Sequence, residues 1–123
     1  MVDKNMAIAQ GYYTAMAQKD AAGLEQRLHP AVHFVSPLAE LHGKEDVFAA
    51  VKGFMGAFQA LTIRASFGSE TQAMLAIDTL FPVPIGNLRT ASLVTIKDGL
   101  ITKIELFYDG KQLEKKSSDI FGN

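Results

Sequence analysis

One carboxylate in the sequence stands inside a strongly apolar stretch. Asp78 lies between the apolar residues 74–77 and the segment 79–81, which reads Thr-Leu-Phe. Burial among apolar groups raises the pKa of a carboxyl group, and such a group can serve as a general acid or base. Its candidate polar partners are the hydroxyl groups of Tyr12, Ser36, Ser92 and Tyr108. This combination predicts acid or base catalysis, with Asp78 and Tyr12 as the candidate catalytic residues.

The face on which Asp78 lies depends on how its strand pairs. Side chains alternate between the two faces of a strand, so Asp78 shares a face with Met74 and Ala76. A slip of the pairing by one residue would reverse the assignment of faces. Two placements therefore stay open: Asp78 in a pocket, or Asp78 on the outer side of the sheet, toward solvent or a second copy of the chain. The outer placement is our default.

Other kinds of catalytic or metal chemistry find little support in the sequence. Ser36 and Ser92 lack an adjacent base and a Gly-x-Ser-x-Gly context, so we expect them to line a pocket and not to act as nucleophiles. The absence of cysteine excludes thiolate catalysis and thiolate metal ligands. We expect His29 at a helix end, His33 on a strand and His42 in a loop, where they need not converge. The sequence thus predicts no metal site and no cofactor.

The N-terminal half of the chain predicts three helices. Asp3 can cap a helix over residues 4–18, and Asp20 can cap a shorter one that stops near His29, because Pro30 disfavours helical geometry in the residue before it. A third helix from Gly43 has the strongest apolar period, formed by Val47, Val51, Phe54 and Phe58. Its two glycines, Gly53 and Gly56, predict the close approach of a neighbouring element.

Most of the remaining residues are rich in β-forming side chains. We predict a short strand over residues 32–36, a loop over 38–42, and four longer strands over 62–68, 73–81, 88–96 and 100–108. Residues 97–99 are a hairpin turn with glycine in the left-handed conformation. Helices followed by an antiparallel meander predict an α+β fold, in which the helices cover one face of the sheet.

Composition and charge narrow the classes of function. The chain has 123 residues, of which 48% are hydrophobic and 20% charged, which predicts a single domain over residues 1–123. Its net charge is −1 and its basic residues are scattered, so we expect no nucleic-acid partner. The N-terminus lacks the pattern of a secretory signal, and no apolar run approaches the ~20 residues that span a bilayer. We therefore expect a cytoplasmic protein without membrane contact.

The order of elements and several local phrases resemble the nuclear transport factor 2-like superfamily and its SnoaL-like, ketosteroid isomerase-related branch. The phrases are Tyr12-Tyr13 with Ala17-Gln18-Lys19-Asp20, the segment from Val32 to Pro37, and Lys97-Asp98-Gly99-Leu100-Ile101 with Phe107-Tyr108-Asp109. The resemblance implies three helices wrapped by a strongly curved, mainly antiparallel sheet, as a cone-shaped α+β barrel. It also implies an open pocket inside the cone and a homodimer through the outer sheet face.

The resemblance also shows which catalytic groups are missing. Ser36 stands where ketosteroid isomerases carry their carboxylate base, and Ser92 stands where they place a protonated acid, so only Tyr12 matches. A lone serine hydroxyl is too weak a base to abstract a proton next to a carbonyl. The acid–arginine–acid set of limonene epoxide hydrolase-like members is absent as well, because Ala76 and Leu106 occupy its acidic positions. Neither activity is expected.

The resemblance implies a pocket for a small, largely apolar molecule. Its predicted lining residues are Phe34, Ser36, Leu38, Phe54, Phe58, Ser92 and Tyr108. One interpretation is acid or base catalysis of the isomerase, dehydratase or cyclase type by Asp78 with a tyrosine donor. The alternatives are a non-catalytic module that binds a hydrophobic ligand, and a dimeric adaptor whose cone is filled. The fold does not choose among them, because one fold can host many functions.

Overall fold

The computed structural model describes residues 2–111 and alternates helices with strands. In chain order the elements are α1 (Val2–Ala17), α2 (Ala21–Glu25), β1 (Leu28–Val35), β2 (Glu40–His42), α3 (Lys44–Ala57), β3 (Ala60–Gly68), β4 (Gln72–Leu80), β5 (Asn87–Lys97) and β6 (Leu100–Phe107). The three predicted helices and the four predicted long strands are therefore present, with ends within a few residues of those expected.

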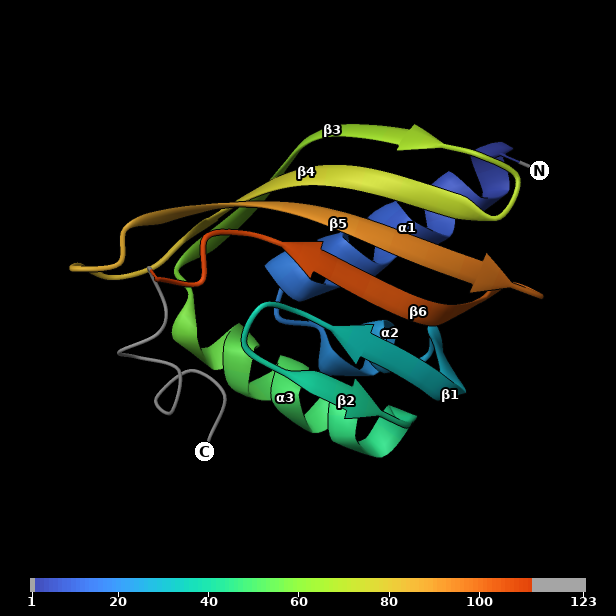
Figure 1. Cartoon of the computed structure of the whole chain (residues 1–123), viewed down its shortest axis with the longest axis horizontal. Helices are drawn as coiled ribbons and strands as arrows, with labels where there is room; N and C mark the ends of the chain where they lie inside the picture. The colour runs from blue at the N-terminus through green and yellow to red at the C-terminus, as the bar shows by residue number, and fades with distance from the viewer. Residues whose placement is uncertain (1, 112–123) are drawn as a thin grey trace.

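The six strands form one sheet in the order β2-β1-β6-β5-β4-β3, so β2 and β3 are its edges (Figure 1). The β1–β6 pair is parallel and the other four pairs are antiparallel. This arrangement confirms the α+β class and the mainly antiparallel sheet.

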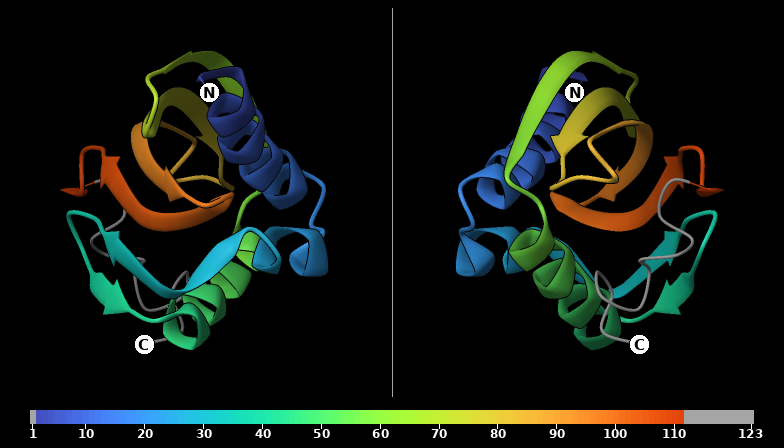
Figure 2. Two further views of the ribbon diagram at one scale, coloured as in Figure 1. Left: turned by 90° about the vertical axis from the view of Figure 1, so that its right-hand side faces the viewer. Right: turned by 90° about the vertical axis from the view of Figure 1, so that its left-hand side faces the viewer.

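The sheet is strongly curved, as its end-on views show (Figure 2). Pairing shifts interrupt three ladders, between Ile63 and Ala65 in β3, between Thr95 and Ile96 in β5, and within β1. Such irregularities bend strands and increase their twist. Helix α1 packs against β3 and β4, and α3 packs against β1 and β2. The two helices thus cover the concave side, and the core lies between them and the sheet.

Local sequence explains where α2 and α3 begin. Helix α1 begins at Val2, so Asp3 lies inside it and is not its cap as predicted. The Asp20 carboxylate accepts a hydrogen bond from the Gly23 backbone N–H at 3.0 Å, so Asp20 caps α2 as predicted. In α3, Glu45 and Asp46 lie in the first turn, where negative charge favours the positive end of the helix dipole. The apolar stripes of both long helices face the core, with Tyr12 and Met16 of α1 and Val51 of α3 all buried.

Two boundaries differ most from the prediction. Helix α2 ends at Glu25, and β1 begins at Leu28, because the Ile101 N–H donates to the Arg27 carbonyl at 2.8 Å and pairs this stretch with β6. Pro30 lies in the irregular part of that pairing, where its missing N–H leaves no gap in the ladder. The predicted loop over 38–42 contains the short strand β2, which pairs with β1.

Among residues 2–111, no helix has both the length and the apolar character needed to cross a membrane.

The prediction of a close neighbour at Gly56 is wrong. A Cβ atom added at this exposed helical position meets no described atom within 4 Å. Gly43, which precedes α3, has a φ of +90°, a conformation that side chains with a Cβ rarely adopt.

We therefore expect opposite effects from the same substitution at these two glycines. Gly56→Ala should raise the free energy of unfolding by about 0.5–1 kcal/mol, because alanine favours the helix and leaves the unfolded chain fewer conformations. Gly43→Ala should lower it by about 1 kcal/mol or more, because of backbone strain. Urea unfolding of the two variants measures both effects. A loss of stability in Gly56→Ala would show that this position is packed.

Candidate functional site

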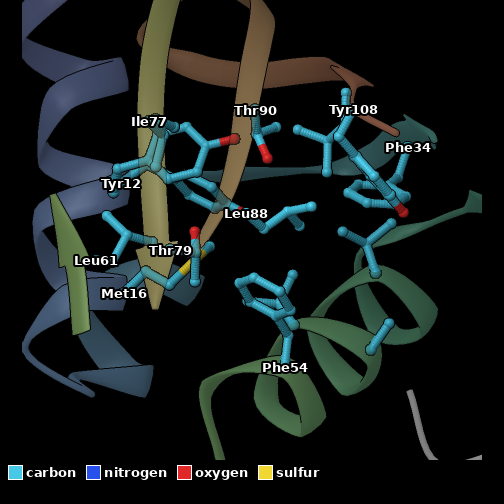
Figure 3. Close-up of a pocket in the computed structure, with 15 residues that line it drawn as sticks. Tyr12, Met16, Phe34, Phe54, Leu61, Ile77, Thr79, Leu88, Thr90 and Tyr108 are labelled. Carbon is cyan, nitrogen blue, oxygen red and sulfur yellow. The ribbon is translucent and has the colours of Figure 1, made fainter. Parts of the chain in front are cut away.

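A pocket of about 50 Å³ lies between the concave face of the sheet and the helices α1 and α3 (Figure 3). We call it the inner pocket. Its lining consists of ten apolar and five hydroxyl-bearing residues: Met16, Phe34, Val47, Ala50, Val51, Phe54, Leu61, Ile77, Leu88 and Leu106, with Tyr12, Tyr13, Thr79, Thr90 and Tyr108. On the scale on which one water molecule needs about 10–15 Å³, the pocket holds only a few waters.

Strand alternation brings the sheet residues of the inner pocket together. In the antiparallel β4–β5 ladder Ile77 pairs with Thr90, and Thr79 pairs with Leu88. Residues that pair directly lie on the same face of a sheet, so these four side chains point to the concave side as a group. Figure 3 shows the two threonines on one side of the pocket and Phe34 and Tyr108 on the other.

A buried hydrogen bond links the first helix to the sheet behind the inner pocket. The Tyr13 hydroxyl and the Ser92 hydroxyl lie 2.5 Å apart, and Ser92 is fully buried. Burial raises the pKa of Tyr13, and the hydrogen bond to Ser92 lowers it by a smaller amount. Because both hydroxyls are satisfied by each other, this pair fixes α1 against β5 and leaves Ser92 outside the pocket lining.

Tyr12 stands next to this pair in α1 and is buried against the pocket. Its ring meets the Tyr13 ring edge to face, with centroids 4.9 Å apart. Burial strongly raises the pKa of Tyr12, and the neighbouring Tyr13 raises it further. The Tyr12 hydroxyl is therefore neutral at neutral pH and can act as a hydrogen-bond donor.

The Tyr108 hydroxyl is buried and has no hydrogen-bond partner among the described residues. Burial raises its pKa, and the nearby Ser36 hydroxyl opposes that shift without forming a hydrogen bond of ordinary geometry. The Ser36 hydroxyl is already committed to its own turn, where it accepts from the Leu38 and Ala39 N–H groups. A buried polar atom without a partner is costly, so Tyr108 is the side chain of this pocket that a ligand would best satisfy.

Asp78 lies outside the inner pocket, on the opposite face of β4. It pairs with Thr62 and Arg89, and its carboxylate lies 3.6 Å from Nη1 of Arg64 and 3.7 Å from Nε of Arg89. Alternation does put it with Met74 and Ala76, but that face is the convex one, because Ile77 and Thr79 point inward. Asp78 therefore cannot act as an acid or base inside the pocket from this position. The position agrees with the outer placement that was our default.

The other predicted site residues divide into two groups. Phe34, Phe54, Tyr12 and Tyr108 line the inner pocket. Ser36, Leu38, Phe58 and Ser92 do not: Ser36 holds a turn, Leu38 packs against the core, and Ser92 bonds Tyr13. Phe58 is buried beneath the Lys19 ammonium group, which lies 3.4 Å from the ring centroid and bonds the Phe58 carbonyl at the end of α3.

Sequence reasoning did not select Thr79, the hydroxyl-bearing residue of β4 that faces the pocket. The charge of the neighbouring residue Asp78 could have identified Thr79 as an inward-facing residue, because the face of an alternating strand that carries a carboxylate is more often exposed. With Asp78 outside, Leu75, Ile77 and Thr79 are inside, as the structure shows. Alternation in β5 likewise puts Thr90 on the inner face.

Two of the three histidines converge, contrary to the expectation from sequence. His33 and His42 are direct partners in the β1–β2 ladder, and their rings stack with centroids 4.3 Å apart. The Glu40 carboxylate lies against both of them. The expectation failed because residues 38–42 were predicted as a loop, which hid the pairing of the two strands. The third histidine, His29, is apart and accepts a hydrogen bond from the Ala31 N–H.

Comparison with known proteins identifies the family to which this architecture belongs. The family model of the SnoaL-like domain matches residues 9–104, which is most of the chain. The chain belongs to the SnoaL-like domain family. No curated protein sequence matches it.

Solved structures share the fold of this SnoaL-like domain at low sequence identity. A protein with a cystatin-like fold from Silicibacter pomeroyi is 17% identical with a TM-score of 0.81, covering 95% of this chain and 84% of that chain. A steroid delta-isomerase from Pseudomonas aeruginosa is 17% identical with a TM-score of 0.76, covering 98% and 96%. An epoxide hydrolase from Mycobacterium tuberculosis is 10% identical with a TM-score of 0.77, covering 93% and 89%. These similarities confirm the cone-like, nuclear transport factor 2-like fold.

The chain has three tyrosines and no tryptophan, so alkaline absorbance reports on Tyr12, Tyr13 and Tyr108 alone. Their raised pKa values predict that the folded protein shows less tyrosinate absorbance at pH ~10 than free tyrosine, which is about half ionised there. Because the pKa values of these tyrosines are higher in the folded than in the unfolded chain, their neutral forms contribute to the stability of the fold. This contribution is complete below pH ~10 and is lost as pH rises through the folded pKa values. A titration followed by absorbance at 295 nm measures the tyrosinate fraction. Half-ionised tyrosine at pH ~10 in the folded protein would mean that the pocket is wet.

Proposed function

We propose that this SnoaL-like domain binds a small, neutral, largely apolar molecule with one hydrogen-bond acceptor, and that it does so without acid or base catalysis. The supporting observation is the chemistry of the inner pocket. Among the described residues, none that lines it carries a carboxylate, an imidazole, an ammonium or a guanidinium group. Its hydroxyl groups are neutral at neutral pH and cannot abstract a proton from carbon.

The lining also defines the complementary ligand. A charged molecule would lose its hydration without gaining a partner of opposite charge, so such a pocket selects against ions. An apolar molecule gains about 25 cal/mol for each Å² that it removes from water. A carbonyl or ether oxygen would accept from the Tyr108 hydroxyl, which has no partner among the described residues. The ligand class is therefore a small ketone or a similar molecule.

The size of the inner pocket limits the ligand. A dry cavity of about 150 Å³ in another protein binds benzene, whereas this pocket measures about 50 Å³. A steroid-sized molecule is excluded in this conformation. Phe54, which contacts Phe58 and Phe81 through its ring, is a half-buried lining side chain of α3 whose rotation would enlarge the pocket.

Two probes of the same shape test the proposal: cyclopentanone, which carries a carbonyl oxygen, and methylenecyclopentane, which carries a methylene group in its place. Both are about as large as benzene, so their binding requires the Phe54 ring to turn and enlarge the pocket. We expect saturable binding of both, detected as shifts of the Met16, Ile77 and Leu88 methyl signals in NMR spectra. Tyr108→Phe should weaken cyclopentanone by about 2–10-fold and leave the hydrocarbon unchanged, because one hydrogen bond contributes about 0.5–1.5 kcal/mol. Ala50→Leu should weaken both probes by filling space.

Asp78→Asn is the matched control, because it changes a carboxylate on the opposite face of the sheet. Its affinity for both probes should equal that of the unmodified protein. Absence of saturable binding of either probe would contradict the proposed function. A loss of binding in Asp78→Asn alone would show that the probes bind at the outer face of the sheet.

We further propose that the chain forms a homodimer through the convex face of the sheet. Four large apolar side chains are exposed there: Phe67 (71%), Met74 (36%), Leu80 (42%) and Phe107 (51%). Phe67 and Met74 pair across β3 and β4, and Met74 also pairs with Leu93 of β5, so the apolar surface is continuous over three strands. Exposed apolar patches of this kind commonly mark interaction sites.

Sedimentation velocity tests the dimer. We expect a dimer for the unmodified chain and a shift toward monomer in Phe67→Lys, because the substitution puts a charge into the apolar contact. Val83→Lys is the control, since Val83 is 90% exposed but lies in the loop between β4 and β5. A monomer at all concentrations, or equal weakening by both substitutions, would contradict the convex face as the interface.

A further inference from the structure

A cluster of metal-ligating side chains lies on the β1–β2 hairpin, on the side opposite to the inner pocket. The Glu40 Oε2 atom lies 2.6 Å from Nε2 of His33 and 3.7 Å from Nε2 of His42. The donor atoms of the three side chains all lie within 4.8 Å of one another. We call these three residues the hairpin triad. Phe34, between His33 and Val35, points the other way and lines the inner pocket.

The backbone of the hairpin holds the triad in place. His33 pairs directly with His42, and Val35 pairs with Glu40, so the three triad side chains emerge on one face by strand register. The turn that joins the strands is closed by the Ser36 N–H, which donates to the Ala39 carbonyl at 2.8 Å, and by the Ser36 side chain. At the other end the Gly43 N–H donates to the Val32 carbonyl at 2.8 Å. The Cα positions are thus fixed independently of any ligand.

The donor set suits one group of cations. Two imidazole nitrogens and one carboxylate oxygen match Zn²⁺ and its first-row neighbours, whereas Mg²⁺ and Ca²⁺ prefer oxygen donors only. Tetrahedral Zn²⁺ with bonds of about 2.0–2.2 Å places its donors roughly 3.3 Å apart. The His42–Glu40 distance of 3.7 Å is close to this spacing, and the His33–Glu40 distance of 2.6 Å must lengthen.

The triad has the freedom to make that adjustment. The side chains of Glu40 and His42 are 58% and 74% exposed, and the stacked rings can turn about their Cβ–Cγ bonds until both nitrogens point to one ion. The nearest cation on the neighbouring strand is Lys103, which pairs with His33 in the β1–β6 ladder. Its ammonium group lies 3.2 Å from the Glu105 carboxylate, which offsets its charge.

We propose that His33, Glu40 and His42 form a surface site for a divalent cation of the zinc class. The site has three protein ligands and leaves at least one coordination position open to water or to a donor from another molecule. Glu40 and His42 lie on the edge strand β2, and His33 lies on its neighbour β1. The site is separate from the inner pocket and does not depend on the function proposed for it.

Titration of the protein with ZnCl₂ by calorimetry, with imidazole NMR spectra, tests the site. We expect one Zn²⁺ per chain and shifts in the imidazole signals of two of the three histidines, with the signals of His29 unchanged. His42→Ala and Glu40→Gln should each weaken binding by about tenfold or more, the loss that follows when a metal site loses even a supporting group. Mg²⁺ should not bind.

His29→Ala is the matched control and should bind Zn²⁺ like the unmodified protein. Equal Zn²⁺ affinity in His33→Ala, His42→Ala and the unmodified chain would overturn the proposal, as would the absence of any imidazole shift at millimolar Zn²⁺. Because the readouts are metal affinity and histidine signals, failure of this site leaves the result for the inner pocket unaffected.

Discussion

The structure depends on one constraint, the exclusion of water from the concave face of a curved sheet. Helices α1 and α3 cover that face, so each inward-pointing side chain must be apolar or find a hydrogen-bond partner within the fold. Ser92 meets the constraint through Tyr13, and their bond fixes α1 on the sheet. Tyr108 does not meet it with any described residue. A hydroxyl without a described partner, in a pocket lined by hydrocarbons and neutral hydroxyls, is the feature that supports the proposed binding function.

The same constraint explains why charge lies on the convex face. Asp78 there lies between Arg64 and Arg89 at distances that allow ion pairing, with water to solvate all three. On the concave face its charge would lose hydration without gaining a partner. The solved structures with steroid isomerase and epoxide hydrolase descriptions share the scaffold, and a shared scaffold leaves the chemistry to the residues inside it. Here those residues are hydroxyls and hydrocarbons.

The sequence was informative wherever one residue type decided the outcome. Asp20 marked the start of α2, the apolar period marked α3, and the Asp98-Gly99 turn marked the last hairpin. It was ambiguous for β4, because Met74 and Leu80 make the outer face almost as apolar as the inner one. The charge of Asp78 was the one local sign that Thr79 lies inside, and the pairing of β4 with β5 decides it.

The hairpin triad shows a second limit. The three residues of β2 have no period of their own, and only their pairing with β1 brings His42 opposite His33. Ser36 was predicted to line the pocket from its place at the end of a strand, but its hydroxyl closes the turn, a choice that serine often makes in loops. In both cases a contact between segments, and not the local sequence, determines the role of the residue.

The most direct test of the account is the position of a bound ligand. Intermolecular NOEs from cyclopentanone in complex with the protein report which side chains surround it. The account predicts NOEs to the Met16 methyl group, to Thr79 and Thr90, and to the Tyr108 ring. NOEs confined to Phe67, Met74 and Phe107 on the convex face would contradict it and would show that the inner pocket is part of a filled core.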